Sequence, residues 1–147
     1  MKPVSFFEKL RSRQELTDWI RNHDPNHKDT WLQENLPKEQ VFQARILDAL
    51  KAWKAAGKID RNAMIWKQGA APYQRQGLPD ITAIIGGRFF GFEVKRPYGV
   101  GRLTGIQAKT IEDINAAGGV AEEVSFADDV KEILVREGAW NNSGEEA

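Results

Sequence analysis

Asp80, Glu93 and Lys95 are the residues of this chain whose types and spacing could do chemistry. Asp80 and Glu93 flank two apolar runs that meet at Gly86-Gly87, which is the pattern of a β-hairpin with a two-residue turn. A register that closes this turn places Asp80 directly opposite Glu93, with their Cβ atoms roughly 5 Å apart. Two opposed carboxylates repel each other, so the pair predicts a bound metal cation.

The two faces of this hairpin are expected to differ, because side chains along a strand alternate between faces. Lys95 falls on the same face as Asp80 and Glu93, which makes a cluster of three charged groups. A lysine that simply ends a strand in solvent is the alternative interpretation of Lys95. The opposite face is apolar and predicts a core: Ile81, Ala83, Ile85, Phe90, Phe92 and Val94.

Glu39 extends the cluster from a different part of the chain. A helix is predicted to start after Pro37, an acceptable first helical residue, and Glu39 lies in its first turn. Ile46 and Leu50 follow at seven and eleven residues, which returns to nearly the same side of a helix. Glu39 is therefore expected to point towards the sheet, where a carboxylate needs a neutralising partner. The alternative is that Glu39 stays solvated and complements the helix N-terminus.

Gln107 has two compatible interpretations. Thr104-Gly105-Ile106-Gln107 fits a capping box, in which the glutamine side chain returns to the start of its helix. The same side chain could also lie at the edge of the site formed by Asp80 and Glu93.

The elements that must position these residues follow from periodicity and from turn residues. In chain order, we predict a helical segment over 4–22, a helix that starts after Pro37 and ends at Gly57, a strand over 63–66 and the hairpin over 77–95. A helix over 104–117, a strand over 120–125, a helix over 128–136 and an acidic tail over 141–147 follow. This order predicts an α/β fold with a small mixed central sheet flanked by helices.

Composition restricts the class of protein. A chain of 147 residues, of which 41% are hydrophobic, can bury one core. It contains no cysteine, so disulfides and thiolate zinc sites are excluded. We see no signal peptide and no run of about 18 apolar residues. A cytoplasmic protein with no membrane association and no nucleotide cofactor is expected.

The zero net charge hides a strong asymmetry along the chain. Residues 67–109 carry 7 basic and 2 acidic side chains, whereas residues 110–147 carry 2 basic and 10 acidic ones. The basic excess surrounds the acidic pair, which favours a polyanionic partner such as nucleic acid. A surface with charges scattered for solubility is the alternative.

Pro79-Asp80, twelve further residues and then Glu93-Val94-Lys95 resemble the signature of the PD-(D/E)XK nuclease superfamily. The wider pattern is similar to the VRR-NUC domain of that superfamily over about residues 38–136. Its elements are Glu39 at a helix start, Gly77-Leu78-Pro79-Asp80, Glu93-Val94-Lys95-Arg96-Pro97, Gly101-Arg102-Leu103-Thr104 with Gln107, and Gly118-Gly119 before a strand. The loop from Lys67 to Gln76 shows no feature of the family.

This resemblance implies a restriction-endonuclease-like core and hydrolysis of DNA phosphodiesters with Mg²⁺ or Mn²⁺. Asp80, Glu93 and the Val94 carbonyl would hold the metal, and Glu39 would bind it directly, through water, or through a second ion. Lys95 would position the attacking water, and Gln107 would orient Lys95 or contact a phosphate. The basic side chains expected to grip the DNA backbone are Lys67, Arg75, Arg96, Arg102 and Lys109.

The resemblance also implies a homodimer that cuts branched DNA such as four-way junctions, because symmetric cutting needs two sites at a fixed separation. The nuclease domain would span residues 38–138, after a helical extension over 1–37 and before a disordered acidic tail over 139–147. The aromatic residues of the extension (Phe6, Phe7, Trp19 and Trp31) would join the dimer surface, cover the core, or simply pad the fold. Two other functions stay open: a restriction or defence nuclease acting on duplex DNA, and an inactive DNA-binding module.

Overall fold

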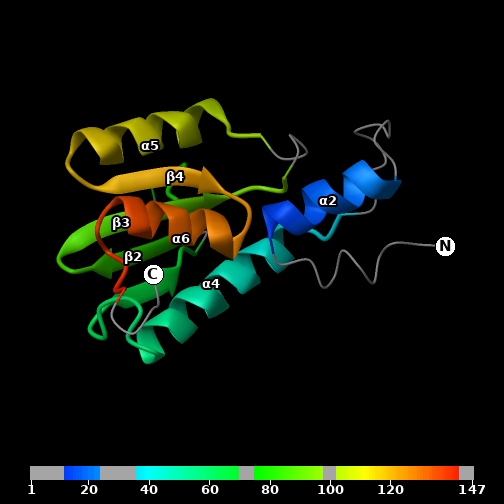
Figure 1. Cartoon of the computed structure of the whole chain (residues 1–147). Coiled ribbons are helices and arrows are strands. Elements are labelled where there is room, and N and C mark those ends of the chain that lie inside the picture. The colour runs from blue at the N-terminus through cyan, green and yellow to red at the C-terminus, as the bar shows by residue number, and fades with distance from the viewer. Residues whose placement is uncertain (1–11, 24–35, 70–74, 98–101, 143–147) are drawn as a thin grey trace.

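The computed structural model of the chain describes residues 12–23, 36–69, 75–97 and 102–142 (Figure 1). Several sequence-based expectations lie outside these ranges. They concern the start of the helical segment predicted over 4–22, the aromatic residues Phe6, Phe7 and Trp31, Gly101 of the family pattern and the last five residues of the tail.

A four-stranded mixed sheet forms the centre of the described structure. Its strands are β1 (Met64–Lys67), β2 (Ile81–Ile85), β3 (Arg88–Val94) and β4 (Val120–Val124), and they lie side by side in that order. The pairs β1–β2 and β2–β3 are antiparallel, and β4 runs parallel to β3. The mixed α/β architecture expected from the order of elements is therefore confirmed.

Helices lie on both faces of this sheet (Figure 1). They are α2 (Arg13–His23), α4 (Glu39–Ala55), α5 (Gly105–Ala116) and α6 (Ala127–Arg136). Helices α4 and α6 contact each other on one face, whereas α5 runs along β3 and β4 on the other. The predicted start of α4 was one residue too early, since Lys38 caps a helix that begins at Glu39 and Pro37 precedes it.

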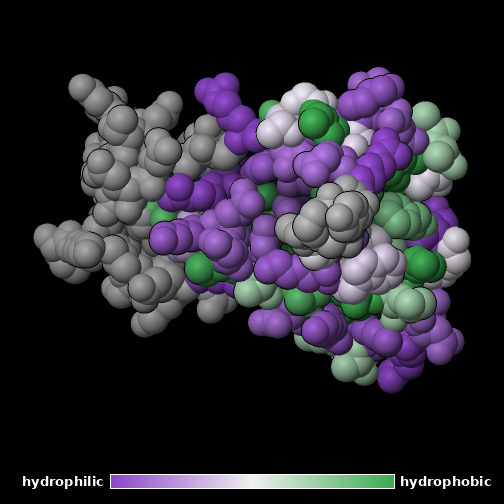
Figure 2. All heavy atoms as spheres, turned by 180° about the vertical axis from the view of Figure 1, so that it is seen from behind, coloured by the Kyte–Doolittle hydropathy of each residue, from purple (hydrophilic) through white to green (hydrophobic). Residues whose placement is uncertain are grey.

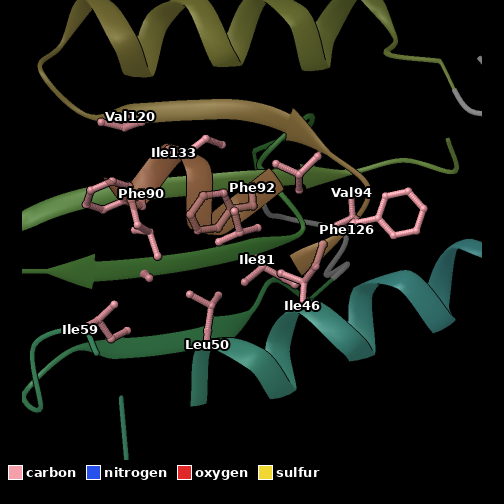
Figure 3. Packing of buried hydrophobic residues seen from close by; sticks show 14 of the residues in the cluster. Ile46, Leu50, Ile59, Ile81, Phe90, Phe92, Val94, Val120, Phe126 and Ile133 are labelled. Carbon is pink, nitrogen blue, oxygen red and sulfur yellow. The ribbon is translucent and has the colours of Figure 1, made fainter. Parts of the chain in front are cut away.

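The hydrophobic core lies between the sheet and α4 and α6, where side chains from both layers point toward one another (Figure 3). All six apolar residues expected on one face of the hairpin are buried, as predicted. Phe42, Ile46 and Leu50 cover them from α4 and are at most 1% exposed. Val41, which belongs to the same apolar run, instead lies on the outer side of the helix and is 37% exposed.

The hairpin turn consists of Gly86 and Gly87, as expected. Both have positive φ angles, 57° and 81°, a conformation that side chains with a Cβ rarely adopt. This turn type matches the twist of the flanking strands and sets their register. Ile85 pairs with Arg88, and Ile81 pairs with Phe92.

The described part of the N-terminal extension packs onto the rest of the fold. Leu16 of α2 is fully buried in the hydrophobic core, and Trp19 packs against it. Arg13 donates to Asp129 at the start of α6, with an N–O distance of 2.8 Å. Although burial opposes the shift, this hydrogen bond and the backbone N–H groups of Phe126 and Ser125 lower the pKa of Asp129.

The chain remains packed beyond the end of α6. Trp140 is 8% exposed and meets Trp53 edge-on, with ring centroids 5.1 Å apart. Asn141 donates through its side chain to the Gly57 carbonyl at 2.9 Å. The segment expected to be a disordered tail from residue 139 therefore begins with residues that belong to the fold, because Trp140 buries a large apolar ring against α4.

The outer surface seen from behind is mostly hydrophilic, with hydrophobic residues scattered among hydrophilic ones (Figure 2). Within the described ranges, no helix is long and apolar enough to cross a membrane.

Candidate active site

Asp80 and Glu93 face each other at one end of the hairpin. The pairing of β2 with β3, extended by one residue beyond Ile81 and Phe92, places Asp80 opposite Glu93 as predicted. One oxygen of Asp80 accepts a hydrogen bond from the Val94 N–H at 2.8 Å. This bond holds the Asp80 side chain against β3, the strand that carries Glu93.

Glu93 is a buried carboxyl group, with 1% of its surface exposed. Its Oε2 accepts a hydrogen bond from Gln107 Nε2 at 3.1 Å and lies 3.6 Å from Lys95 Nζ. Its Oε1 is also buried and has no hydrogen-bond partner among the described residues. A buried carboxylate oxygen without a partner is energetically unfavourable unless a proton or a cation satisfies it.

Lys95 lies between two acidic groups. Its Nζ is 3.6 Å from Glu93 Oε2 and 3.8 Å from Glu39 Oε1, and the residue is 8% exposed. The backbone of Lys95 is hydrogen-bonded to the end of β4 and to the residue after it. Its N–H donates to the Val124 carbonyl at 2.9 Å, and its carbonyl accepts from Ser125 Oγ at 2.6 Å. The ammonium group is therefore positioned by the sheet and does not extend freely into solvent.

Glu39 reaches the same cluster from the first turn of α4, as expected. Gln43, one turn later on the helix, donates to Glu39 Oε2 at 3.3 Å and is 8% exposed. Burial raises the pKa of Glu39, and the nearby Lys95 opposes the shift. Gln43 was not identified from the sequence, although its spacing of four residues from Glu39 places the two side chains on one helix face.

Gln107 serves both functions considered for it, through different atoms of one amide. Its Oε1 accepts a hydrogen bond from the Thr104 N–H at 3.0 Å, and its own N–H donates to Thr104 Oγ1 at 3.1 Å, which confirms the capping box. Its Nε2 donates to Glu93 Oε2 at 3.1 Å, so the amide orients Glu93 directly and not Lys95. The amide therefore fixes the orientation of the Glu93 carboxyl group relative to α5.

The electrostatics of the site favour the neutral form of Glu93 in the metal-free protein. Burial, together with the neighbouring carboxyl group of Asp80, raises the pKa of Glu93 to about 9, and Lys95 opposes the shift. A pKa this high for a carboxyl group in a polar cluster is typical of functional sites. A divalent cation would replace the proton on Glu93.

The donor set fits a hard divalent cation. Asp80 and Glu93 supply carboxylate oxygens, and Glu93 Oε1 is the oxygen that lacks a partner. The N–H and C=O of a strand residue point to the same side, so the Val94 carbonyl is directed towards Asp80, to which its N–H already donates. Oxygen ligands of these kinds suit Mg²⁺ or Mn²⁺.

Lys95 Nζ lies between Glu39 and Glu93, 3.8 Å from Glu39 Oε1 and 3.6 Å from Glu93 Oε2. The charge of Asp80 helps to raise the pKa of Glu39, and the charge of Glu39 helps to raise the pKa of Glu93, so Glu39 lies close to the pair. Within the described residues, no three acidic, histidine or cysteine side chains are already arranged around a metal position.

The five basic residues expected to bind DNA differ in what they contact. Arg96 donates to the backbone carbonyls of Leu36 and Pro37 and so holds the segment that leads into α4. Arg75 and Lys109 both pair with Asp113 on α5, with N–O distances of 3.2 and 3.0 Å. The remaining two, Lys67 and Arg102, have exposed side chains. Arg96 thus has a structural contact that the sequence did not indicate.

Gly91 makes room for the segment that carries Asp80. A Cβ built on Gly91 would lie 2.6 Å from the Pro79 ring, which packs directly on this strand. We expect Gly91→Ala to displace Pro79 and Asp80, to destabilise the fold by about 1–3 kcal/mol, and to lower metal affinity. Thermal unfolding with and without Mn²⁺ measures both effects.

Gly105→Ala is the matched control, because a Cβ at Gly105 meets nothing within 4 Å. An alanine there should leave metal affinity unchanged. If Gly91→Ala had the same stability and the same metal affinity as Gly105→Ala, the packing of Pro79 on Gly91 would not be what positions Asp80.

Comparison of the chain with protein-family models, with curated proteins and with solved structures finds no match. The site must therefore be interpreted from its own residues and geometry.

Proposed function

We propose that this protein is a divalent-metal-dependent endodeoxyribonuclease with a PD-(D/E)XK core of the VRR-NUC type. The observation that carries this proposal is the buried Glu93, whose Oε1 lacks a partner, opposite Asp80 and 3.6 Å from Lys95 Nζ. The hairpin with this cluster, followed by α5, the parallel strand β4 and α6, supports the fold assignment.

Asp80, Glu93 and the Val94 carbonyl would hold the Mg²⁺ or Mn²⁺ ion, and Glu39 would bind it directly, through water, or through a second ion. When bound, such an ion polarises the scissile phosphate and lowers the pKa of water beside it. Lys95 would orient the attacking water and offset negative charge that develops on the phosphate. Gln107 would keep the Glu93 carboxyl group in its orientation, and Gln43 would do the same for Glu39.

Four basic residues with exposed side chains would bind the DNA backbone: Lys67, Arg75, Arg102 and Lys109. Of these, Arg75 and Lys109 also pair with Asp113. Contacts of this kind give affinity but no sequence preference. The excess of basic residues over 67–109 and of acidic residues over 110–147 supports a molecule with one face towards DNA. We propose branched DNA as the substrate and a homodimer as the active form, since paired cuts need two sites.

A panel of labelled DNAs tests this proposal: a four-way junction, a flap, a linear duplex and a single strand, each with Mg²⁺, Mn²⁺ or EDTA. We expect cleavage with either metal, none in EDTA, and paired nicks at symmetric positions of the junction. Sedimentation should show a dimer. Preference for linear duplex, or a monomer that nicks one strand, would contradict junction resolution and leave the nuclease assignment standing.

Lys95→Ala should separate chemistry from binding. Because Lys95 Nζ lies inside the cluster and is 8% exposed, we expect kcat to fall by about 100–1,000-fold with little change in the Kd for DNA measured in EDTA.

Arg102→Ala is the contrasting variant for Lys95→Ala. It should weaken DNA binding and reduce the slope of log K against log salt by about 0.9, with little effect on the rate of the bound complex. Poor binding by Lys95→Ala with a normal rate for its bound fraction would show that Lys95 is only a phosphate anchor.

A further inference from the structure

A groove of about 620 Å³ opens to solvent beside the edge strand β1, apart from the acidic cluster. Its lining combines cationic, amide and large apolar side chains: Lys54, Arg61, Asn62, Met64 and Trp66. β1 pairs with β2 on one side, and the groove follows its other edge. This composition differs from that of a purely apolar crevice.

The segment that supplies the lining of the groove has a high positive charge. Residues 51–67, from the last turns of α4 to the end of β1, carry five basic side chains and one acidic one. We call the five basic residues the basic ridge: Lys51, Lys54, Lys58, Arg61 and Lys67. Lys54 and Arg61 line the groove itself, and Lys67 directly follows Trp66 in the chain. The one acid, Asp60, accepts hydrogen bonds from the N–H groups of Asn62 at 2.9 Å and Gly86 at 3.3 Å, so it holds two turns together.

Trp66 is the aromatic residue of the groove. It is half-buried, and it is not among the tryptophans that pack against the hydrophobic core, which are Trp19, Trp53 and Trp140 in the described structure. Trp66 pairs with Thr82, two residues from Asp80 along β2, and so shares the sheet face of Asp80. Because Trp66 also lines the groove, its side chain can meet a ligand that enters there.

The end of the groove at Trp66 lies close to the acidic cluster of Asp80 and Glu93. Gln68, two residues after Trp66, donates through its N–H to the Asp80 carbonyl at 2.7 Å. Strand rise and strand spacing place the Cα atoms of Trp66 and Asp80 roughly 8 Å apart. A strand of nucleic acid that leaves the acidic cluster along β1 would therefore pass over Trp66.

We propose that this groove binds an unpaired DNA strand next to the cleavage site, with a base stacked on Trp66 and phosphates on the basic ridge. Stacking on aromatic side chains within a positively charged groove is how proteins bind single strands without reading sequence. The proposal rests on the proposed nuclease function and adds a substrate feature to it: unpaired nucleotides beside the scissile bond, as at a branch point.

A second copy of the chain is the competing occupant of this edge. Pairing of β1 with β1 of another copy would bring two basic ridges, each with five basic residues and one acid, against each other. Like charges held face to face are destabilising. A polyanion neutralises the positive charge of the basic ridge, whereas a second copy of the chain adds to that charge.

The test measures binding of a labelled oligothymidylate of about 12 nucleotides by fluorescence polarisation in EDTA, which prevents cleavage. Trp66→Ala should raise the Kd by about 5- to 100-fold, whereas Trp66→Phe, which keeps a stacking ring, should stay within a few-fold of wild type. Lys54→Ala and Lys67→Ala should each reduce the salt slope by about 0.7, the value for a single strand.

Arg21→Ala is the control for lost positive charge, because α2 lies at the opposite end of α4 from the basic ridge (Figure 1). It should leave the Kd and the salt slope unchanged. Trp66→Phe also controls for folding, since its thermal midpoint can be compared with that of Trp66→Ala.

Unchanged oligothymidylate binding by Trp66→Ala would overturn the groove proposal, even if Asp80→Asn still abolished cleavage. Loss of dimerisation in Trp66→Ala, with binding of the oligonucleotide unaffected, would assign the edge to a second copy. If instead wild-type protein cut no DNA but Trp66→Ala still lost oligonucleotide binding, the groove would stand and the nuclease assignment would fail.

Discussion

Asp80→Asn and Glu93→Gln are each expected to lower metal-dependent DNA cleavage about 1,000-fold or more, since a bound metal supplies several kcal/mol of transition-state stabilisation. The fold should survive, because neither side chain belongs to the hydrophobic core. Glu93→Gln removes the carboxylate whose Oε1 has no partner in the described structure. Single-turnover cleavage of a four-way junction in Mg²⁺ measures the loss.

Glu112→Gln is the matched control, because it removes one carboxylate from the exposed side of α5. Its cleavage rate should equal that of wild type. Isothermal titration with Mn²⁺ should show lost metal binding for the two site variants and normal binding for the control. Full cleavage by Asp80→Asn in Mg²⁺ would defeat the assignment of the metal site.

The stability of the metal-free protein is expected to fall as the pH rises from about 5 to about 9. Burial and the adjacent Asp80 raise the pKa of Glu93 from 4.5 to about 9, so between these values the folded state binds a proton that the unfolded state has lost. Stability decreases with pH wherever the folded state binds more protons. The raised pKa of Glu39 acts in the same direction.

Thermal unfolding in EDTA across this pH range measures the effect. Glu93→Gln should flatten the profile and be more stable than wild type at pH 8 to 9, because the buried group no longer ionises. Mn²⁺ should stabilise wild type most at high pH, where binding no longer has to displace a proton. The lowered pKa of Asp129 affects stability only below this range, since its ordinary value is 3.8. A flat wild-type profile would show that Glu93 is ionised in the metal-free protein.

The register of the hairpin could be predicted from the sequence because it depends on local constraints. Two glycines fix a two-residue turn, and the period of two along each strand then determines which residues face each other. Asp80 opposite Glu93, the buried apolar face and the capping box of Gln107 follow from short-range geometry. The helix positions also follow, because apolar periodicity and flanking Gly and Pro residues act over a few residues.

What the sequence could not determine was how segments far apart in the chain meet. Lys95 lies between Glu39 and Glu93 only because α4 packs on the sheet with its first turn beside the end of β3. Arg96 contacts the carbonyls before α4, and Trp140 packs on Trp53, for the same reason.

The groove beside β1 also required the tertiary structure, although its residues are close in the chain. Lys54 and Trp66 line one surface because α4 and β1 pack together at an edge of the sheet. Local periodicity specifies which side of a strand or helix a residue occupies. The partner on that side depends on packing between elements, which side-chain volumes and burial over the whole core determine.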